Sequence, residues 1–92
     1  MLICETAYPA TPHFGGQFTD WKNAVEGYPP SNDGQARWLT DLAKTVRQNQ
    51  SFVGAIHWSP EWYSGGMWNA FSLFDARGIA RPGVRSFREV VP

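Results

Sequence analysis

The chain has 92 residues with a formal net charge of +0, and its aromatic residues, 15% of the total, include five tryptophans. A chain of this length forms one small domain, residues 1–92, which hides only about 60–65% of its unfolded surface. Balanced charge without a run of lysine or arginine argues against nucleic acid and anionic membranes as partners. Its apolar runs fall short of the ~20 residues that span a bilayer, and its single cysteine excludes an internal disulfide framework.

Two apolar segments predict buried strands with one helix between them. The first, Leu2–Cys4, is apolar at every position, which is typical of a strand buried on both faces. The stretch over 8–31 is broken by prolines and glycines and predicts a long loop. A helix then begins at Ser31 or Asn32, either of which can cap it, and its apolar face runs to about Gln48.

The second buried strand is predicted over Phe52–Trp58. A strand, a helix and a second strand form a βαβ unit, whose strands are parallel and whose crossover is right-handed. After a short apolar segment, Ala70–Phe74, Pro82 is suited to the first position of a last helix. The chain is therefore predicted to be of the α/β class, with two parallel strand–helix units.

Chemistry-bearing side chains gather where these two strands end. Glu5 follows the first strand, and His57 and Trp58 end the second, so parallel strands would bring all three to one edge of the sheet. In α/β barrels that edge forms the active-site face. Each residue also has an ordinary explanation, as a solvated glutamate, a hydrogen-bonded structural histidine or a packed tryptophan.

Trp58, Glu61 and Trp62 lie within five residues of one another, next to a tyrosine. A loop that buried these rings would need a larger core than this chain has, so a sugar-stacking face is at least as good an explanation as packing. Of the other tryptophans, Trp38 lies on the apolar face of the helix and is predicted to be core, whereas Trp21 and Trp68 stay unassigned.

Other kinds of site find no support. The glycine pairs lack the patterns that cradle a phosphate. His13 and His57 are far apart and lack the HExxH arrangement of a catalytic zinc site. We therefore expect no cofactor and no metal.

A set of short strings in consistent order resembles the C-terminal part of a known enzyme family. In chain order they are Glu5-Thr6-Ala7-Tyr8-Pro9, Gly34-Gln35, Gly54-Ala55-Ile56-His57-Trp58-Ser59-Pro60-Glu61-Trp62, Trp68-Asn69, Leu73-Phe74-Asp75 and Gly78. The family is glycoside hydrolase family 53, whose members are arabinogalactan endo-β-1,4-galactanases, retaining glycosidases built on a TIM (β/α)₈ barrel.

The resemblance implies roles for individual residues. Leu2–Cys4 would be the seventh barrel strand, with Glu5 at its end as the catalytic nucleophile, and the second strand would be the eighth. Trp58 would line the floor of the sugar site, and the remaining residues that we expect to bind substrate are Tyr8, His57, Glu61 and Trp62. One departure is that Ser59 stands where the family has a glutamate, with Glu61 following Pro60 instead.

A complete TIM barrel takes ~250 residues, so this chain supplies a quarter of one. Retaining hydrolysis needs a nucleophile and an acid/base carboxyl ~5–5.5 Å apart, and the family's second glutamate follows the fourth strand, outside this sequence. Two parallel strands alone leave apolar sheet edges open. We therefore expect a homo-oligomer in which strands of neighbouring copies continue the sheet, four copies supplying the eight strands of a closed barrel.

Three functions stay open for the chain. The first is weak or residual hydrolysis of a β-linked polysaccharide, with Glu5 as nucleophile and Glu61 or the Glu5 of another copy as acid/base. The others are non-catalytic sugar binding by Tyr8, Trp58 and Trp62, and pure assembly. A cellulase- or mannanase-like barrel is the alternative ancestry, because those enzymes also place a glutamate after the seventh strand and a tryptophan after the eighth. The chain shows no signal-peptide pattern, although the family is typically secreted, so localisation stays open.

Overall fold

The computed structural model describes residues 2–14, 24–58 and 66–90. In chain order its elements are strand β1 (Leu2–Thr6), helix α1 (Asn32–Gln48), strand β2 (Gly54–His57), and the 3₁₀ helices η1 (Gly66–Ala70) and η2 (Pro82–Val90). The predicted strand–helix–strand–helix order and the last helix beginning at Pro82 are confirmed. Within the described ranges, no helix has the length and apolar character needed to cross a membrane.

Helix α1 begins and ends where local sequence signals place it. Ser31 is the N-cap: its backbone is extended, and its Oγ accepts a hydrogen bond of 3.0 Å from the backbone N–H of Gly34. Leu39, Ala43 and Val46 recur at helical spacing and are buried against the rest of the chain. The boundary at Gln48 agrees with the prediction.

Strands β1 and β2 pair in parallel, as the βαβ order predicts. The paired residues are Leu2 with Gly54, Ile3 with Ala55, and Thr6 with His57. Between the last two pairs β1 advances one residue more than β2, which is the signature of a β-bulge. Strand β1 therefore runs through Glu5, beyond its predicted end, and β2 is shorter than predicted at both ends.

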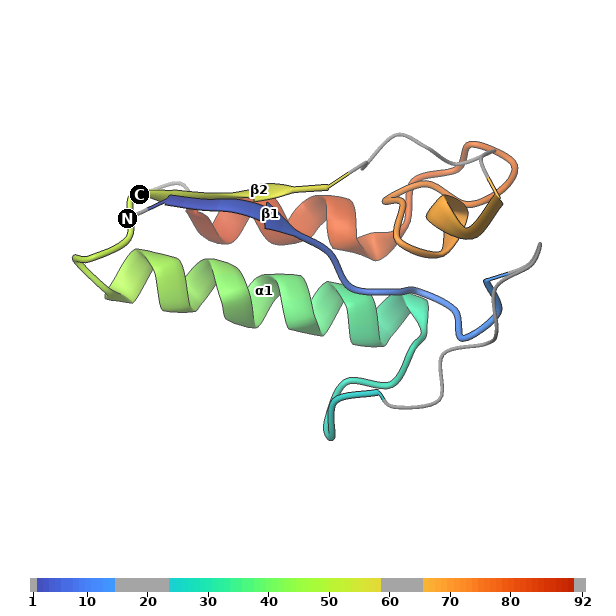
Figure 1. The fold of residues 1–92 in the computed structure, drawn as a ribbon, viewed down its shortest axis with the longest axis horizontal. Coiled ribbons are helices and arrows are strands. Elements are labelled where there is room, and N and C mark those ends of the chain that lie inside the picture. Colours follow the sequence, from blue (N-terminus) through green and yellow to red (C-terminus); the bar gives the residue numbers. More distant parts are fainter. Residues whose placement is uncertain (1, 15–23, 59–65, 91–92) are drawn as a thin grey trace.

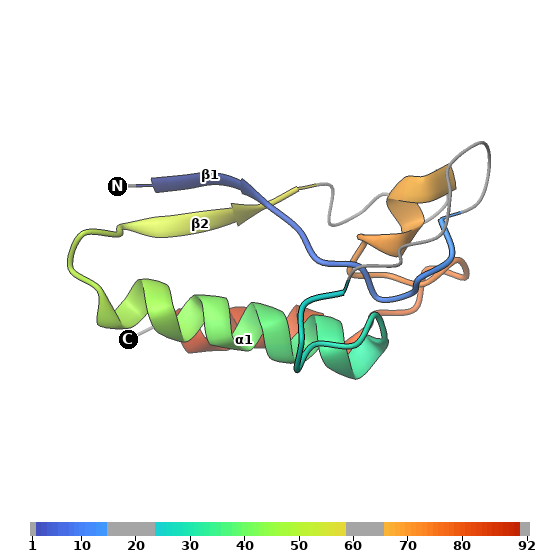
Figure 2. The same cartoon turned by 60° about the horizontal axis from the view of Figure 1, so that its bottom comes forward.

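Helices α1 and η2 form one layer under the sheet (Figure 2). Helices α1 and η2 lie side by side and run in the same direction (Figure 1). Thr40 Oγ1 donates to Ser86 Oγ at 2.9 Å, and Ser86 Oγ donates to the Ala36 carbonyl at 2.9 Å. Gly83 permits this close approach, because a Cβ at that position would come within 3.1 Å of Leu39 Cδ1.

The expectation that both strands are buried on both faces is wrong. Leu2 and Ile56 are 46% and 53% exposed, because α1 and η2 cover only one side of the sheet. Within the described ranges the sheet contains two strands, so each has one edge without a strand partner there. The result is an open α/β sheet with one covered and one uncovered face.

Candidate active site

The segments that follow β1 and β2 leave the sheet at the same end, where η1 also lies (Figures 1 and 2). At this end the backbone N–H of Trp58 donates to the Thr6 carbonyl at 2.7 Å. The backbone of β1 and the backbone that follows β2 therefore still run side by side just beyond β2. This pairing brings the end of β1, with Glu5, next to Trp58, as the parallel topology predicts.

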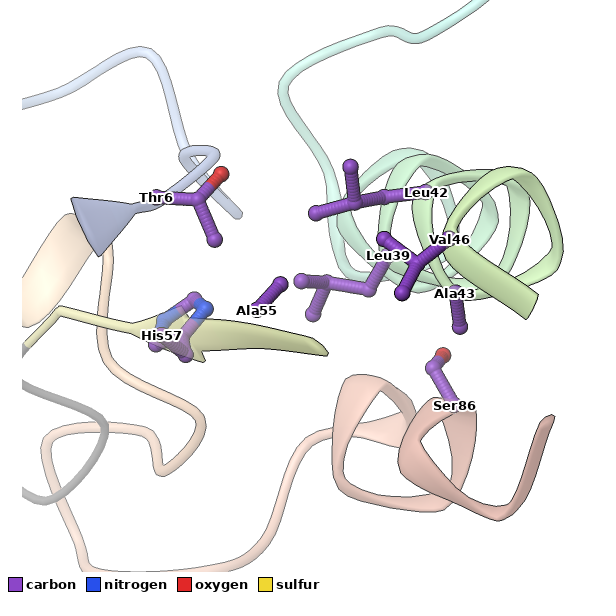
Figure 3. A pocket seen from close by; sticks show the side chains of 8 residues that line it. All are labelled: Thr6, Leu39, Leu42, Ala43, Val46, Ala55, His57 and Ser86. Carbon is purple, nitrogen blue, oxygen red and sulfur yellow. The ribbon is translucent and has the colours of Figure 1, made fainter. Parts of the chain in front are cut away.

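The side-chain direction of Trp58 follows from those of its neighbours. Thr6, Ala55 and His57 point into a cavity between the sheet and the helices (Figure 3). Trp58 follows His57, and successive side chains of a strand point to opposite faces, so Trp58 is turned away from α1. Glu5 lies at the bulge of β1 and is not one of the residues that line the cavity. Glu5 is exposed, and Trp58 is 40% exposed. The two residues thus lie outside the cavity, at the C-terminal end of the sheet.

The cavity on the covered face cannot hold a sugar. Its volume is about 20 Å³, room for about one water molecule. Most of its lining is aliphatic, with side chains of α1 facing those of the strands (Figure 3). This cavity therefore offers no saccharide site, and the exposed carboxylate of Glu5 lies outside it.

Trp68 is the residue at this site that the sequence left unassigned. It lies in η1 and is 37% exposed, and its ring meets that of Trp58 edge to face, with centroids 6.3 Å apart and planes inclined by 71°. The two residues are ten positions apart, without a periodic pattern to link them. The five-residue helix η1 turns Trp68 toward Trp58.

The expected contact of His57 with substrate does not fit its position. The imidazole is 7% exposed and faces the helices with Ala55, because strand alternation sends it to the opposite side from Trp58. Its Nε2 lies 3.0 Å from the carbonyl oxygen of Phe71. His57 is thus a buried histidine with a hydrogen-bond partner inside the fold.

The expected sugar platform at Tyr8 does not fit either. Tyr8 is 4% exposed. Its ring stacks on Trp38 with centroids 5.2 Å apart and meets the Tyr28 ring edge to face with centroids 6.2 Å apart. The hydroxyl donates to the Tyr28 carbonyl at 2.5 Å and accepts from the backbone N–H of Val25 at 3.1 Å. Tyr8 is therefore a core residue that ties the 24–31 segment to α1, and Trp38, which was predicted to be core, stacks on Tyr8 but stays partly exposed.

Gln35 holds the loops around the site in place. Its side chain is fully buried, and its Nε2 donates to the carbonyls of Tyr8 (3.0 Å), Phe71 (3.3 Å) and Ser72 (3.2 Å). One amide group on α1 thus joins the segment that follows β1 to the segment that follows η1. Sequence reasoning missed this role of Gln35, because its three carbonyl partners lie in two remote segments.

Arg81 fastens the same segment from the other side. Its Nη1 donates to the carbonyls of Asn69 and Ser72, both at 2.7 Å. Burial lowers the pKa of the Arg81 guanidinium, and the charge of nearby Asp75 acts in the opposite direction. The segment 69–72 is therefore held by hydrogen bonds from both α1 and the residue that precedes η2.

Two expected site residues, Glu61 and Trp62, lie outside the described residues. In the part of the chain that the structure covers, no three histidine, cysteine, aspartate or glutamate residues are grouped so that they could hold a metal ion.

The family model for glycosyl hydrolase family 53 matches residues 1–87. The chain belongs to glycosyl hydrolase family 53. Among family relatives, the arabinogalactan endo-β-1,4-galactanase of Cellvibrio japonicus (strain Ueda107) is 33% identical over 88 residues, which cover 83% of this chain and 23% of that protein. An uncharacterized protein in the bgaB 5′ region of Niallia circulans is 34% identical over 91 residues, covering 83% of this chain and 25% of that protein. The chain thus spans about a quarter of the length of these relatives.

Solved structures of family 53 match the fold. A family 53 catalytic domain from Ignisphaera aggregans matches with a TM-score of 0.77 at 28% identity, over 99% of this chain and 30% of that one. A fungal β-1,4-galactanase structure matches with a TM-score of 0.70 at 23% identity, over 95% of this chain and 27% of that one, and shows the fold alone. The expected partial barrel is confirmed: this family 53 chain has the parallel strands of part of a TIM barrel, in an open sheet.

Proposed function

We propose that this family 53 chain forms the nucleophile side of a site that hydrolyses β-1,4-galactan, with Glu5 as nucleophile and Trp58 as the platform under a sugar ring. The observation that carries the proposal is the exposure of both Glu5 and Trp58 at the C-terminal ends of two parallel strands. Active sites of TIM barrels lie at this end of the sheet. The named activity of the Cellvibrio relative supports galactan over cellulose or mannan.

In the proposed reaction a carboxylate oxygen of Glu5 forms a bond to the anomeric carbon. The bond from that carbon to the leaving oxygen breaks, and its electron pair departs with the oxygen. Water then hydrolyses the glycosyl–Glu5 ester and regenerates the carboxylate. The exposure of Glu5 gives a saccharide access to this carboxylate.

Natural galactan also requires a second carboxyl, ~5–5.5 Å from the nucleophile, to protonate the leaving oxygen. The resemblance implies that family members carry this glutamate after the fourth strand. We propose that in this chain Glu61, or a carboxyl from another copy, protonates the leaving oxygen only inefficiently. Turnover of galactan by the 92-residue chain is therefore slow.

A substrate with a leaving group that needs no proton separates the role of Glu5 from that of the acid. We would incubate the chain with a 2,4-dinitrophenyl β-galactobioside and measure released dinitrophenolate and the intact protein mass. The proposal predicts covalent attachment of one galactobiosyl group, mapped to Glu5 by peptide mass analysis and lost in Glu5→Gln. Glu26→Gln, which removes another exposed carboxylate, is the matched control and should label normally. Labelling that persists in Glu5→Gln, or fails in the unaltered chain, would refute the nucleophile assignment.

The substrate class is tested by binding. We would titrate the chain with β-1,4-linked oligosaccharides of galactose, glucose and mannose and follow tryptophan fluorescence. A response to galactan oligosaccharides that is lost in Trp58→Ala is expected. A stronger response to the glucose or mannose series would favour a cellulase- or mannanase-like site. Galactan binding without covalent labelling would identify a non-catalytic binding chain.

We also propose that the 92-residue chain self-associates through its open sheet. Leu2 and Ile56 are about half exposed and Val53, just before β2, is 79% exposed, so an unusual amount of apolar surface lies on and beside the two strands. The free edge of β1 in one copy can pair with that of β2 in the next, which continues the sheet, and four copies supply eight strands. Light scattering should give a mass above that of the monomer, and Ile56→Lys should lower it. A folded monomer over a wide concentration range would contradict this assembly.

A further inference from the structure

We propose that Trp68 is a positioning residue that holds the Trp58 ring in the orientation required of a sugar platform. The inference rests on the proposed function of Trp58 as that platform. Trp58 follows the last residue of β2 and is 40% exposed, so the strand itself does not enclose its ring. A platform residue must present one ring face in a set direction, because a stacked sugar contacts the face and not the edge.

The contact with Trp68 can set that direction. The two indole rings meet edge to face at a centroid distance of 6.3 Å and an interplanar angle of 71°, an arrangement favoured by the charge distribution of aromatic rings. Rotation of Trp58 about its side-chain bonds would break this contact. Both rings remain more than a third exposed, so the contact leaves ring surface for a ligand.

Trp68 can act as a support because it is itself held by other rings. It meets Phe71 at 6.3 Å with planes inclined by 51°, and Phe71 meets Phe14 at 5.2 Å with planes inclined by 52°. Phe14 is 9% exposed and belongs to the segment that follows β1. A row of four rings therefore connects the end of β2 to the segment that follows β1.

The backbone around Trp68 is held as well. The Trp68 carbonyl accepts hydrogen bonds of 3.1 Å from the N–H groups of Phe71 and Ser72. Farther along this segment, the Asn69 carbonyl accepts a hydrogen bond from Arg81, and the Phe71 carbonyl accepts one from Gln35 and lies 3.0 Å from Nε2 of His57. Gln35, His57 and Arg81 are buried side chains from different parts of the fold. The predicted ligand residue His57 thus serves the site indirectly, through the segment that carries Trp68.

Circular dichroism tests the ring pair without any sugar. Two indoles at this distance couple their transitions and give a pair of bands of opposite sign near 230 nm. We expect the unaltered chain to show this couplet, and Trp58→Phe and Trp68→Phe each to lose it, with no further loss in the double variant. Trp38→Phe, which removes an indole stacked on Tyr8, is the control and should keep it. A couplet that survives either Trp58→Phe or Trp68→Phe would overturn the inference.

The positioning role is tested by sugar affinity. We expect Trp68→Ala to weaken binding of β-1,4-galactan oligosaccharides by roughly two- to tenfold, the range that an edge-to-face aromatic contact supports. Trp68→Phe should recover most of the affinity, because phenylalanine restores a ring at this position, whereas a general loss of structure would appear as a lower melting temperature in both variants.

The outcomes separate this inference from the proposed function. Unchanged affinity in Trp68→Ala, with the couplet lost, overturns the positioning role and leaves Trp58 as a platform. If the unaltered chain shows the couplet but binds no galactan oligosaccharide, the sugar site itself is refuted, and the contact between the two rings serves only packing.

Discussion

Replacing Gly34 with alanine tests how the start of α1 is built. An alanine in a helix is ordinarily more stable than glycine by about 1 kcal/mol. Here a Cβ on residue 34 would overlap the carbonyl oxygen of Pro29, which belongs to the segment leading into the helix. The substitution therefore sets a helix-propensity gain against a steric clash with backbone.

The size of the clash term follows from what must move. Displacing the Pro29 carbonyl breaks its 2.8 Å hydrogen bond from the Ser31 N–H and disturbs Tyr28, whose carbonyl accepts from Tyr8 and whose hydroxyl donates to Asp41 at 2.7 Å. At about 0.5–1.5 kcal/mol for each of these hydrogen bonds, the loss exceeds the propensity gain. We expect Gly34→Ala to destabilise the chain by about 1–3 kcal/mol and to lower the melting temperature by roughly 4–20 °C.

Thermal and urea unfolding followed by circular dichroism measure this change. Gly54→Ala is the matched control, because a Cβ there would meet only Leu2 Cδ1, at an ordinary 3.7 Å, and its effect should stay within about 0.5 kcal/mol. If Gly34→Ala proved as stable as the unaltered chain or more so, the Pro29 carbonyl would not be packed against residue 34, and the reasoning would be refuted.

Two further predictions concern the core and the pH dependence. Leu39 is buried beside the cavity between sheet and helices, so Leu39→Ala should enlarge an existing void and cost about 3–5 kcal/mol in chemical denaturation; a cost below about 1 kcal/mol would contradict this packing. The hydrogen bond to Asp41 raises the pKa of Tyr28, so the folded state holds the phenolic proton more tightly than the unfolded state does. The resulting stabilisation of the fold is complete below pH 10 and is lost as the pH rises through the pKa of Tyr28 in the folded state. The melting temperature of the unaltered chain should therefore exceed that of Tyr28→Phe at pH 8 and lose this advantage toward pH 11, whereas a constant difference would argue against the Tyr28–Asp41 contact.

The residues of the site show where sequence reasoning succeeds. Helix α1 agreed with its predicted bounds because capping by Ser31 and the spacing of apolar residues are local signals. The placement of Glu5 and Trp58 at the same end of the sheet was predictable because a strand–helix–strand order makes the strands parallel. The same order, with the short motifs along the chain, was enough to indicate the family.

Side-chain direction and exposure could not be predicted in the same way. Tyr8 and His57 lie beside the proposed nucleophile and platform in the sequence, yet both turn inward, toward Trp38 and Phe71. The direction of each depends on strand register, the bulge in β1 and the position of α1, which arise from contacts between distant residues. Gln35 was overlooked for the same reason, since its three carbonyl partners lie in two remote segments.

The sequence by itself determined that this is a small α/β chain with a capped helix, two parallel strands and a carboxylate and a tryptophan at their ends. These features depend on composition, periodicity and chain order, all of which are carried by neighbouring residues. Only the tertiary structure showed that Trp68 lies beside Trp58, because the two rings are brought together by η1 and by contacts with Phe71. It also decided that the sheet has one uncovered face, since coverage depends on where the helices pack.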